Sequence, residues 1–217
     1  FSLIGLYTLL TYFEFHRNAV IEPSNLEALN IPILATLPSV EKIDKGYHLS
    51  QIFMEDVNSE FSESIRTLRT LLIAKYQKKK SFLVTSTYSG EGKTTIALNI
   101  SLAFSKIGKV LLVETDIRRP SVLNLINKKE DERRRPGFSD LVQGQVEFSD
   151  TIINIPGSEI DLMTSGSRRS DLTDLTTPAK LKEFFDYLKE QYDYVVLDTP
   201  PIQPVSGKIV PRYAGPS

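Results

Sequence analysis

The spacing of apolar residues changes along the chain, and each spacing predicts an element. From residue 58 onward, apolar side chains recur every three or four positions, at Phe61, Ile65, Leu68 and Leu72. This period predicts a helix that begins at the N-cap Asn58. We expect it to end at Lys78–Lys80, where cations meet the negative end of the helix dipole.

The following segments alternate between strand and helix patterns. Short apolar runs at 81–86, 110–113, 160–163 and 194–197 are typical of strands buried in a parallel sheet. Between them, residues 94–107 form a helical pattern whose apolar side includes Ile107, with Gly108 at the C′ position. A second helix begins at the cap Thr177 with Pro178 at N1, and residues 120–150 predict short helical turns around a charged loop. This alternation favours an α/β fold with a mostly parallel sheet flanked by helices.

The two ends of the chain follow other patterns. Residues 1–15 are almost wholly apolar or aromatic, which favours the end of a transmembrane helix over a buried helix or a disordered end. Residues 16–57 hold three prolines and scattered charge, which predict a juxtamembrane linker. Residues 202–217 predict a loop. A sheet that stops there would lack strands on one side, so we expect the domain at 58–217 to be truncated at its C-terminal side.

Composition narrows the chemistry. Lys and Arg number 26 against 27 Asp and Glu, so bulk charge does not argue for nucleic acid, and no nucleic-acid partner is expected. The chain has no Cys and two His, which excludes thiolate metal sites and Cys nucleophiles and disfavours a His-built metal centre. Carboxylate, lysine and backbone chemistry remain, and these groups suit phosphates and magnesium.

A phosphate-binding pattern follows the first predicted strand. Residues 87–95 read Thr-Tyr-Ser-Gly-Glu-Gly-Lys-Thr-Thr, at a junction between strand and helix. The glycines allow backbone N–H groups to turn toward phosphate oxygens, Lys93 can reach the β- and γ-phosphates, and the Thr94 hydroxyl can bind Mg²⁺. The alternative is a helix-opening turn that merely contains Gly and Lys, since Thr87 stands where the pattern has its first glycine. The residues expected to bind the nucleotide here are Ser89, Gly90, Glu91, Gly92, Lys93, Thr94 and Thr95.

Charged residues also follow two later strands. Glu114, Asp116 and Arg118 come at alternate positions after the strand at 110–113, and Asp198 comes directly after the strand at 194–197. We expect Arg118 to meet phosphate charge and Asp116 to hold Mg²⁺ or orient an attacking hydroxyl. Asp198 would anchor Mg²⁺ through water, so the metal residues are Thr94, Asp116 and Asp198. A polar turn at a strand end is the alternative for each motif alone.

Together these motifs resemble the bacterial tyrosine autokinases of capsule and exopolysaccharide export, relatives of the ParA/MinD class of P-loop ATPases. The family's oligomerisation signature, Glu-x-x-Arg-x-x-Arg, stands here as Glu63, Arg66 and Arg69, roughly opposite the apolar stripe of that helix. Without the other motifs, an exposed ladder of salt bridges would explain these three residues. The chain departs from the family at Glu114, where the family has Asp, and it shows no tyrosine-rich tail.

The resemblance implies an activity and a setting. The activity is an ATP- and Mg²⁺-dependent protein-tyrosine autokinase that regulates polysaccharide chain length and export, with Lys93, Glu114, Asp116 and Asp198 as catalytic residues. The implied partners are a homo-oligomeric ring of the same chain and membrane-embedded chain-length or polymerase components. The implied location is the bacterial inner membrane, with the kinase domain cytoplasmic. Two alternatives stay open: a ParA/MinD-type ATPase switch without kinase activity, and a non-catalytic adaptor of a polysaccharide polymerase.

Overall fold

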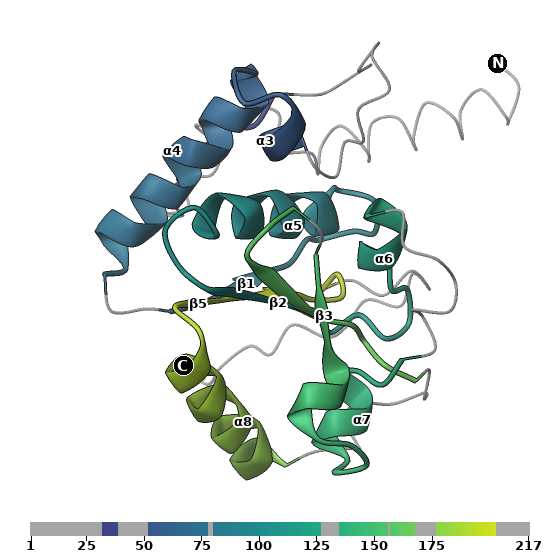
Figure 1. Cartoon of the computed structure of the whole chain (residues 1–217). Helices are drawn as coiled ribbons and strands as arrows, with labels where there is room; N and C mark the ends of the chain where they lie inside the picture. The colour runs from purple at the N-terminus through teal and green to yellow at the C-terminus, as the bar shows by residue number, and fades with distance from the viewer. Residues whose placement is uncertain are drawn as a thin grey trace, which may run out of the picture. The chain divides into compact units, whose positions relative to one another are not determined.

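The computed structural model describes residues 32–38, 52–77, 80–126, 135–155, 157–167 and 177–202. The chain divides into two units, Phe1–Thr36 and Leu37–Ser217, and the second contains a five-stranded sheet with helices on both faces (Figure 1). The transmembrane end expected at 1–15 and most of the loop expected at 202–217 lie outside the described residues. Among the helices that are described, none combines the length and the hydrophobicity needed to cross a bilayer.

The sheet is mostly parallel, as predicted. Its strands are β1 (Ser81–Val84), β2 (Val110–Glu114), β3 (Ile152–Asn154), β4 (Ile160–Met163) and β5 (Tyr194–Asp198). They lie in the order β1-β5-β2-β4-β3, with β3 antiparallel to β4 and the other neighbouring pairs parallel. The sequence did not predict β3, because three residues are too few to show a period. Parallel strands end at one edge, so the residues after β1, β2 and β5 converge there.

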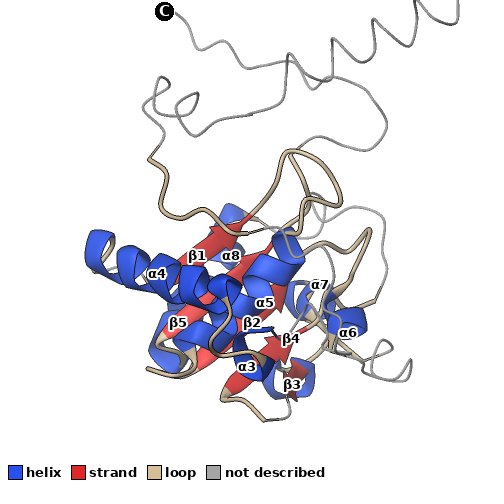
Figure 2. Cartoon of the chain, turned by 90° about the horizontal axis from the view of Figure 1, so that it is seen from above, coloured by secondary structure: helices blue, strands red, loops and turns tan. Residues whose placement is uncertain are grey.

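Helices cover both faces of the sheet (Figures 1 and 2). One hydrophobic cluster joins α3 (Ile52–Glu55), α4 (Glu60–Lys75), α5 (Lys93–Phe104) and α6 (Val122–Leu125) to one face. The other joins α7 (Phe138–Val142), the 3₁₀ turn Phe148–Thr151 and α8 (Pro178–Gln191) to the opposite face. Along β2, Leu112 enters the first cluster while Leu111 and Val113 enter the second, as alternation in a strand requires. The predicted α/β architecture is therefore confirmed.

Helix α4 confirms the predicted apolar stripe but not its predicted ends. Phe61 and Ile65 are buried, and the later stripe residues pack against the same cluster. The N-cap is Ser59 rather than Asn58, because the Ser59 hydroxyl accepts the Ser62 N–H at 3.2 Å. The helix ends at Lys75, so the expected closure at Lys78–Lys80 is wrong. Five residues separate this end from β1.

Helix α5 also differs from its prediction at the C-terminal end. It stops at Phe104 with Ser105 as the cap, and Ile107, expected on the apolar side, is 49% exposed. Gly108 does not have the left-handed conformation of a C′ glycine. Its place is explained by close packing instead, because an added Cβ would lie 2.8 Å from the Asp193 Cβ. The first strand is likewise shorter than expected and ends at Val84.

Two further elements bear on the predictions. Helix α3 lies inside the range 16–57 that was expected to be a linker. Its Phe53 side chain is buried in the first cluster, and the Phe53 N–H donates to Asn99 Oδ1 of α5 at 3.1 Å. Helix α8 begins as predicted, with Pro178 at N1 and the Thr177 hydroxyl accepting the Lys180 N–H.

Candidate functional site

The loop between β1 and α5 has the backbone shape that phosphate binding requires. Gly90 and Gly92 have φ values of 90° and 82°, in the left-handed region that favours glycine. Gly92 is the N-cap of α5, and Ile96 N–H donates to its carbonyl at 2.9 Å. The loop therefore leads directly into a helix N-terminus, where backbone N–H groups point outward. Ser89, Glu91 and Thr95, also expected to bind the nucleotide, belong to this loop and the first turn of α5.

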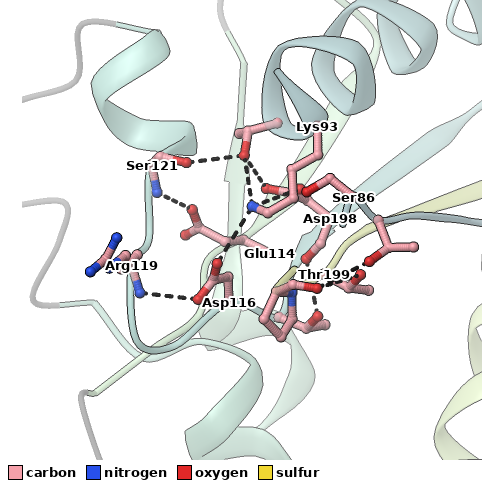
Figure 3. Close-up of polar contacts among 12 residues, drawn as sticks. Ser86, Lys93, Glu114, Asp116, Arg119, Ser121, Asp198 and Thr199 are labelled. Carbon is pink, nitrogen blue, oxygen red and sulfur yellow. Dashed lines mark hydrogen bonds and ion pairs between the residues drawn. The ribbon is translucent and has the colours of Figure 1, made fainter. Parts of the chain in front are cut away.

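Lys93 lies between the two carboxylates that the sequence placed at strand ends (Figure 3). Its ammonium nitrogen is 3.4 Å from Asp116 Oδ2 and 3.6 Å from Asp198 Oδ1. The Thr94 hydroxyl donates to Asp198 Oδ2 at 2.7 Å. Residues from α5, from the turn after β2 and from the end of β5 thus meet at the carboxyl edge of the sheet, as the motifs predict.

Asp198 is the most deeply buried group of the site. It is fully buried, and Asp198 Oδ1 receives no hydrogen bond from any described residue. Burial raises the pKa of Asp198, and the nearby Asp116 carboxylate raises it further, although the Thr94 hydroxyl and the Lys93 ammonium act in the opposite direction. Keeping Asp198 ionised in the folded protein therefore costs free energy.

Glu114 points away from Lys93 and toward backbone N–H groups. Its Oε1 atom accepts the N–H groups of Ser121 at 2.5 Å and Val122 at 2.8 Å, and Oε2 accepts the Ser165 N–H at 3.4 Å. Burial raises the pKa of Glu114, partly offset by these three N–H groups. Of the four residues expected to be catalytic, the structure brings Lys93, Asp116 and Asp198 into contact and directs the Glu114 carboxylate to two neighbouring loops.

Sequence reasoning missed one hydroxyl in the site. Ser121 Oγ donates to Thr94 Oγ1 at 3.1 Å, from the turn between β2 and α6 (Figure 3). A serine in a polar turn shows no spacing that would distinguish it, so no sequence signal could have found it. Arg118, expected to meet phosphate charge, is exposed on the same turn.

The donor set fits a hydrated Mg²⁺ ion. Two carboxylates face one ammonium, so the site has excess negative charge, and Asp198 Oδ1 is a buried acceptor that receives no hydrogen bond within the described residues. No cluster of three or more Asp, Glu, His or Cys side chains suited to a metal occurs in the described part of the chain. Mg²⁺ is commonly held by one or two carboxylates together with waters and substrate phosphates, which suits this smaller set.

The residues expected at a subunit contact lie on α4, away from this site. Arg66 pairs with Glu63 at 2.7 Å and also donates to the Val57 carbonyl. Arg69 donates to the Ala103 carbonyl near the C-terminal end of α5 at 2.9 Å, so its guanidinium binds within the chain. Glu63 remains the most exposed of the three, with 68% of its side chain accessible.

Comparisons with known proteins agree with the motifs. The family described as an AAA domain matches residues 80–208. A Staphylococcus aureus protein named as the tyrosine-protein kinase CapB is 28% identical over 162 residues, which are 73% of this chain and 69% of that protein. A Klebsiella pneumoniae protein named as a tyrosine-protein kinase of the cps region is 29% identical over 215 residues. That match covers 92% of this chain but 29% of the Klebsiella protein, so the chain spans less than a third of its length.

Solved structures agree as well. The crystal structure of the chimerical protein CapA2B2 superposes with a TM-score of 0.71 at 28% identity, over 85% of this chain and 77% of that one. The resemblance to bacterial tyrosine kinases of capsule loci, drawn above from the motifs, is thereby confirmed, as is the P-loop type of α/β fold.

Proposed function

We propose that the chain, which belongs to the AAA domain family, is an ATP-dependent protein-tyrosine kinase, since relatives that it matches are named as tyrosine-protein kinases. The observation that carries the proposal is the meeting of Lys93, Thr94, Asp116 and Asp198 at one edge of the sheet. Asp and Lys side chains in a largely water-excluded site, beside a helix N-terminus, suit phosphoryl transfer, in which positioning and electrostatics supply most of the catalysis.

Nucleotide binding would fall to the loop 89–95. The N–H groups that open α5 and the Lys93 ammonium would bind the β- and γ-phosphates of ATP. Lys93 is 10% exposed and already lies beside two carboxylates, so little freedom is lost when it turns to the phosphates. Arg118, exposed on the turn after β2, would add charge at the mouth of the site.

Transfer would use Asp116 as the group that receives a proton. The acceptor tyrosine oxygen attacks the γ-phosphorus, the bond from this phosphorus to the bridging oxygen breaks, and ADP leaves. The hydroxyl proton passes to the Asp116 carboxylate, which Arg119 N–H orients through Asp116 Oδ1 at 3.0 Å. Thr94, Asp116 and Asp198 would hold Mg²⁺, directly or through water, and a bound Mg²⁺ supplies neutralisation of charge on the phosphate oxygens.

The setting of the kinase is part of the same proposal. Residues 58–217, together with α3, whose Phe53 packs into the same hydrophobic cluster, would form a cytoplasmic kinase domain that follows a juxtamembrane linker at the inner membrane of a bacterium. Its partners would be further copies of the chain in a ring and membrane-embedded chain-length or polymerase components, through which it regulates polysaccharide length and export. The match of Glu63, Arg66 and Arg69 to the family's oligomerisation signature supports a contact between copies. Relatives named for capsule loci support the polysaccharide role.

Labelled phosphate tests the kinase activity. The chain is incubated with Mg²⁺ and ATP labelled at the γ-phosphate, and phosphotyrosine is measured after acid hydrolysis. We expect labelled phosphotyrosine from the wild type and from Lys106→Met, an exposed lysine control, but none from Lys93→Met. Phosphate release without phosphotyrosine would replace the kinase with an ATPase switch. If calorimetry detects no binding of Mg²⁺·ATP, the result would favour the non-catalytic adaptor over the kinase.

A further inference from the structure

Two groups outside the expected metal set, the buried Glu114 carboxylate and the Ser121 hydroxyl, are linked. The Ser121 N–H donates to Glu114, and the Ser121 hydroxyl donates to Thr94. We propose that Ser121 is a further residue of the nucleotide site, and that Glu114 acts as a positioning residue that holds Ser121 against Thr94. This inference rests on the proposed binding of ATP with Mg²⁺. It assigns Glu114 a role through the protein backbone rather than through metal or substrate.

The contacts of Glu114 hold the turn that contains Ser121 in place. The side chain is 1% exposed, so each carboxylate oxygen must find its partners inside the protein. One oxygen accepts two consecutive N–H groups, those of Ser121 and Val122, and the other reaches the Ser165 N–H after β4. A carboxylate with these partners fixes the turn that carries Ser121.

The hydroxyl of Ser121 sets the direction of the Thr94 hydroxyl proton. It donates to Thr94 Oγ1 at 3.1 Å, while Thr94 itself donates to Asp198 Oδ2 at 2.7 Å. A hydroxyl has one proton and two lone pairs. Because Ser121 donates to Thr94, the Thr94 proton cannot point back to Ser121 and turns to Asp198. The other lone pair of Thr94 accepts the Lys93 ammonium at 3.3 Å, and it becomes available to a cation or a water when Lys93 turns to the phosphates.

The length of the Glu114 side chain is needed for these contacts. Glu114 is the last residue of β2, and its register partner in β5 is Asp198. An aspartate at 114 would be one methylene shorter, so its carboxylate could not lie where the two consecutive N–H groups now meet Oε1. The glutamate therefore matches a turn that starts seven residues later in the chain. This accounts for Glu at a position where the resemblance gives Asp.

Calorimetric titration of the 217-residue chain with ATP, with and without Mg²⁺, tests the inference. The variants are S121A, S121T, E114D and the double variant E114D/S121A, with S105A as the control, since Ser105 lies at the other end of α5. We expect S121A to weaken binding of Mg²⁺·ATP about five- to tenfold, the size of one hydrogen bond, and to change Mg²⁺-free ATP binding less than twofold. S121T, which keeps the hydroxyl, should bind as the wild type does.

The double variant separates positioning from direct action. If Glu114 acts through Ser121, E114D loses about as much affinity as S121A, and the double variant loses no more than either. Losses that multiply, or an S121A variant with wild-type affinity, would overturn the inference while the proposed function stands. A wild type that binds no nucleotide would remove both. The S121A and S121T pair leaves the buried carboxylate intact, so it decides the role of Ser121 even if E114D fails to fold.

Discussion

Replacing Asp198 by Asn is expected to make the nucleotide-free protein more stable and to abolish its stabilisation by Mg²⁺·ATP. Asp198 is fully buried, and its Oδ1 atom receives no hydrogen bond from the described residues, although Lys93 lies 3.6 Å away. Asparagine keeps an oxygen that can accept the Thr94 hydroxyl and removes a buried charge. Lys93 retains its second partner, Asp116, at 3.4 Å.

The sign follows from the raised pKa of Asp198, which means that the ionised form is disfavoured in the fold. We expect the variant to gain about 1 kcal/mol at pH 7, a size typical of relieved strain in a functional site, and thus about 2–4 °C in Tm. Saturating Mg²⁺·ATP, at about 100 times its Kd, would stabilise the wild type by about 2.7 kcal/mol. The order of the two melting temperatures should therefore reverse when nucleotide is added.

Thermal unfolding followed by circular dichroism, with and without Mg²⁺·ATP, measures both effects. The gain should be present at neutral pH and vanish as the pH falls through the ordinary aspartate value of 3.8, because the carboxyl is then protonated in folded and unfolded chains alike. The control is Asp186→Asn on the surface of α8, where Lys182 and Lys189 lower the pKa of the carboxyl and no gain is expected. An apo Asp198→Asn protein less stable than the wild type at pH 7 would refute the reasoning.

Three further predictions concern single residues. Gly137→Ala should lower the free energy of unfolding by about 2–3 kcal/mol in urea titrations, since an added Cβ would overlap the Thr164 carbonyl; an unchanged midpoint would contradict this packing. Tyr192→Phe should cost about 1 kcal/mol in the same assay, because it loses the 2.8 Å hydrogen bond to Asp161; a cost near zero would mean that water replaces the hydroxyl. Glu91→Ala should weaken ATP binding roughly fivefold in calorimetry while Glu91→Gln binds nearly as the wild type does, because Oε2 accepts two N–H groups of the phosphate loop at 2.8 and 3.0 Å; equal losses in both variants would point to charge instead.

The pattern of the sequence was sufficient for the architecture and for the place of the site. Buried apolar runs alternating with helical periods imply a parallel sheet, and such a sheet brings every strand's carboxyl end to one edge. Lys93, Asp116 and Asp198 each follow or adjoin such an end, so their convergence could be predicted without coordinates. The distances of 3.4 and 3.6 Å from the Lys93 ammonium to the two carboxylates came from the structure. The roles of these residues and of the Glu63, Arg66 and Arg69 group remain predictions.

Tertiary contacts determined several features that no local pattern in the sequence predicts. The N-cap shifted by one residue to Ser59 because the cap depends on which side-chain oxygen accepts the Ser62 N–H, and both Asn58 and Ser59 suit a cap. Strand β3 exists because β4 offers it an edge, since three residues have no period of their own. The direction of the Glu114 carboxylate was set by N–H groups as far as 51 residues along the chain, which only the folded sheet and its loops bring within reach of one side chain.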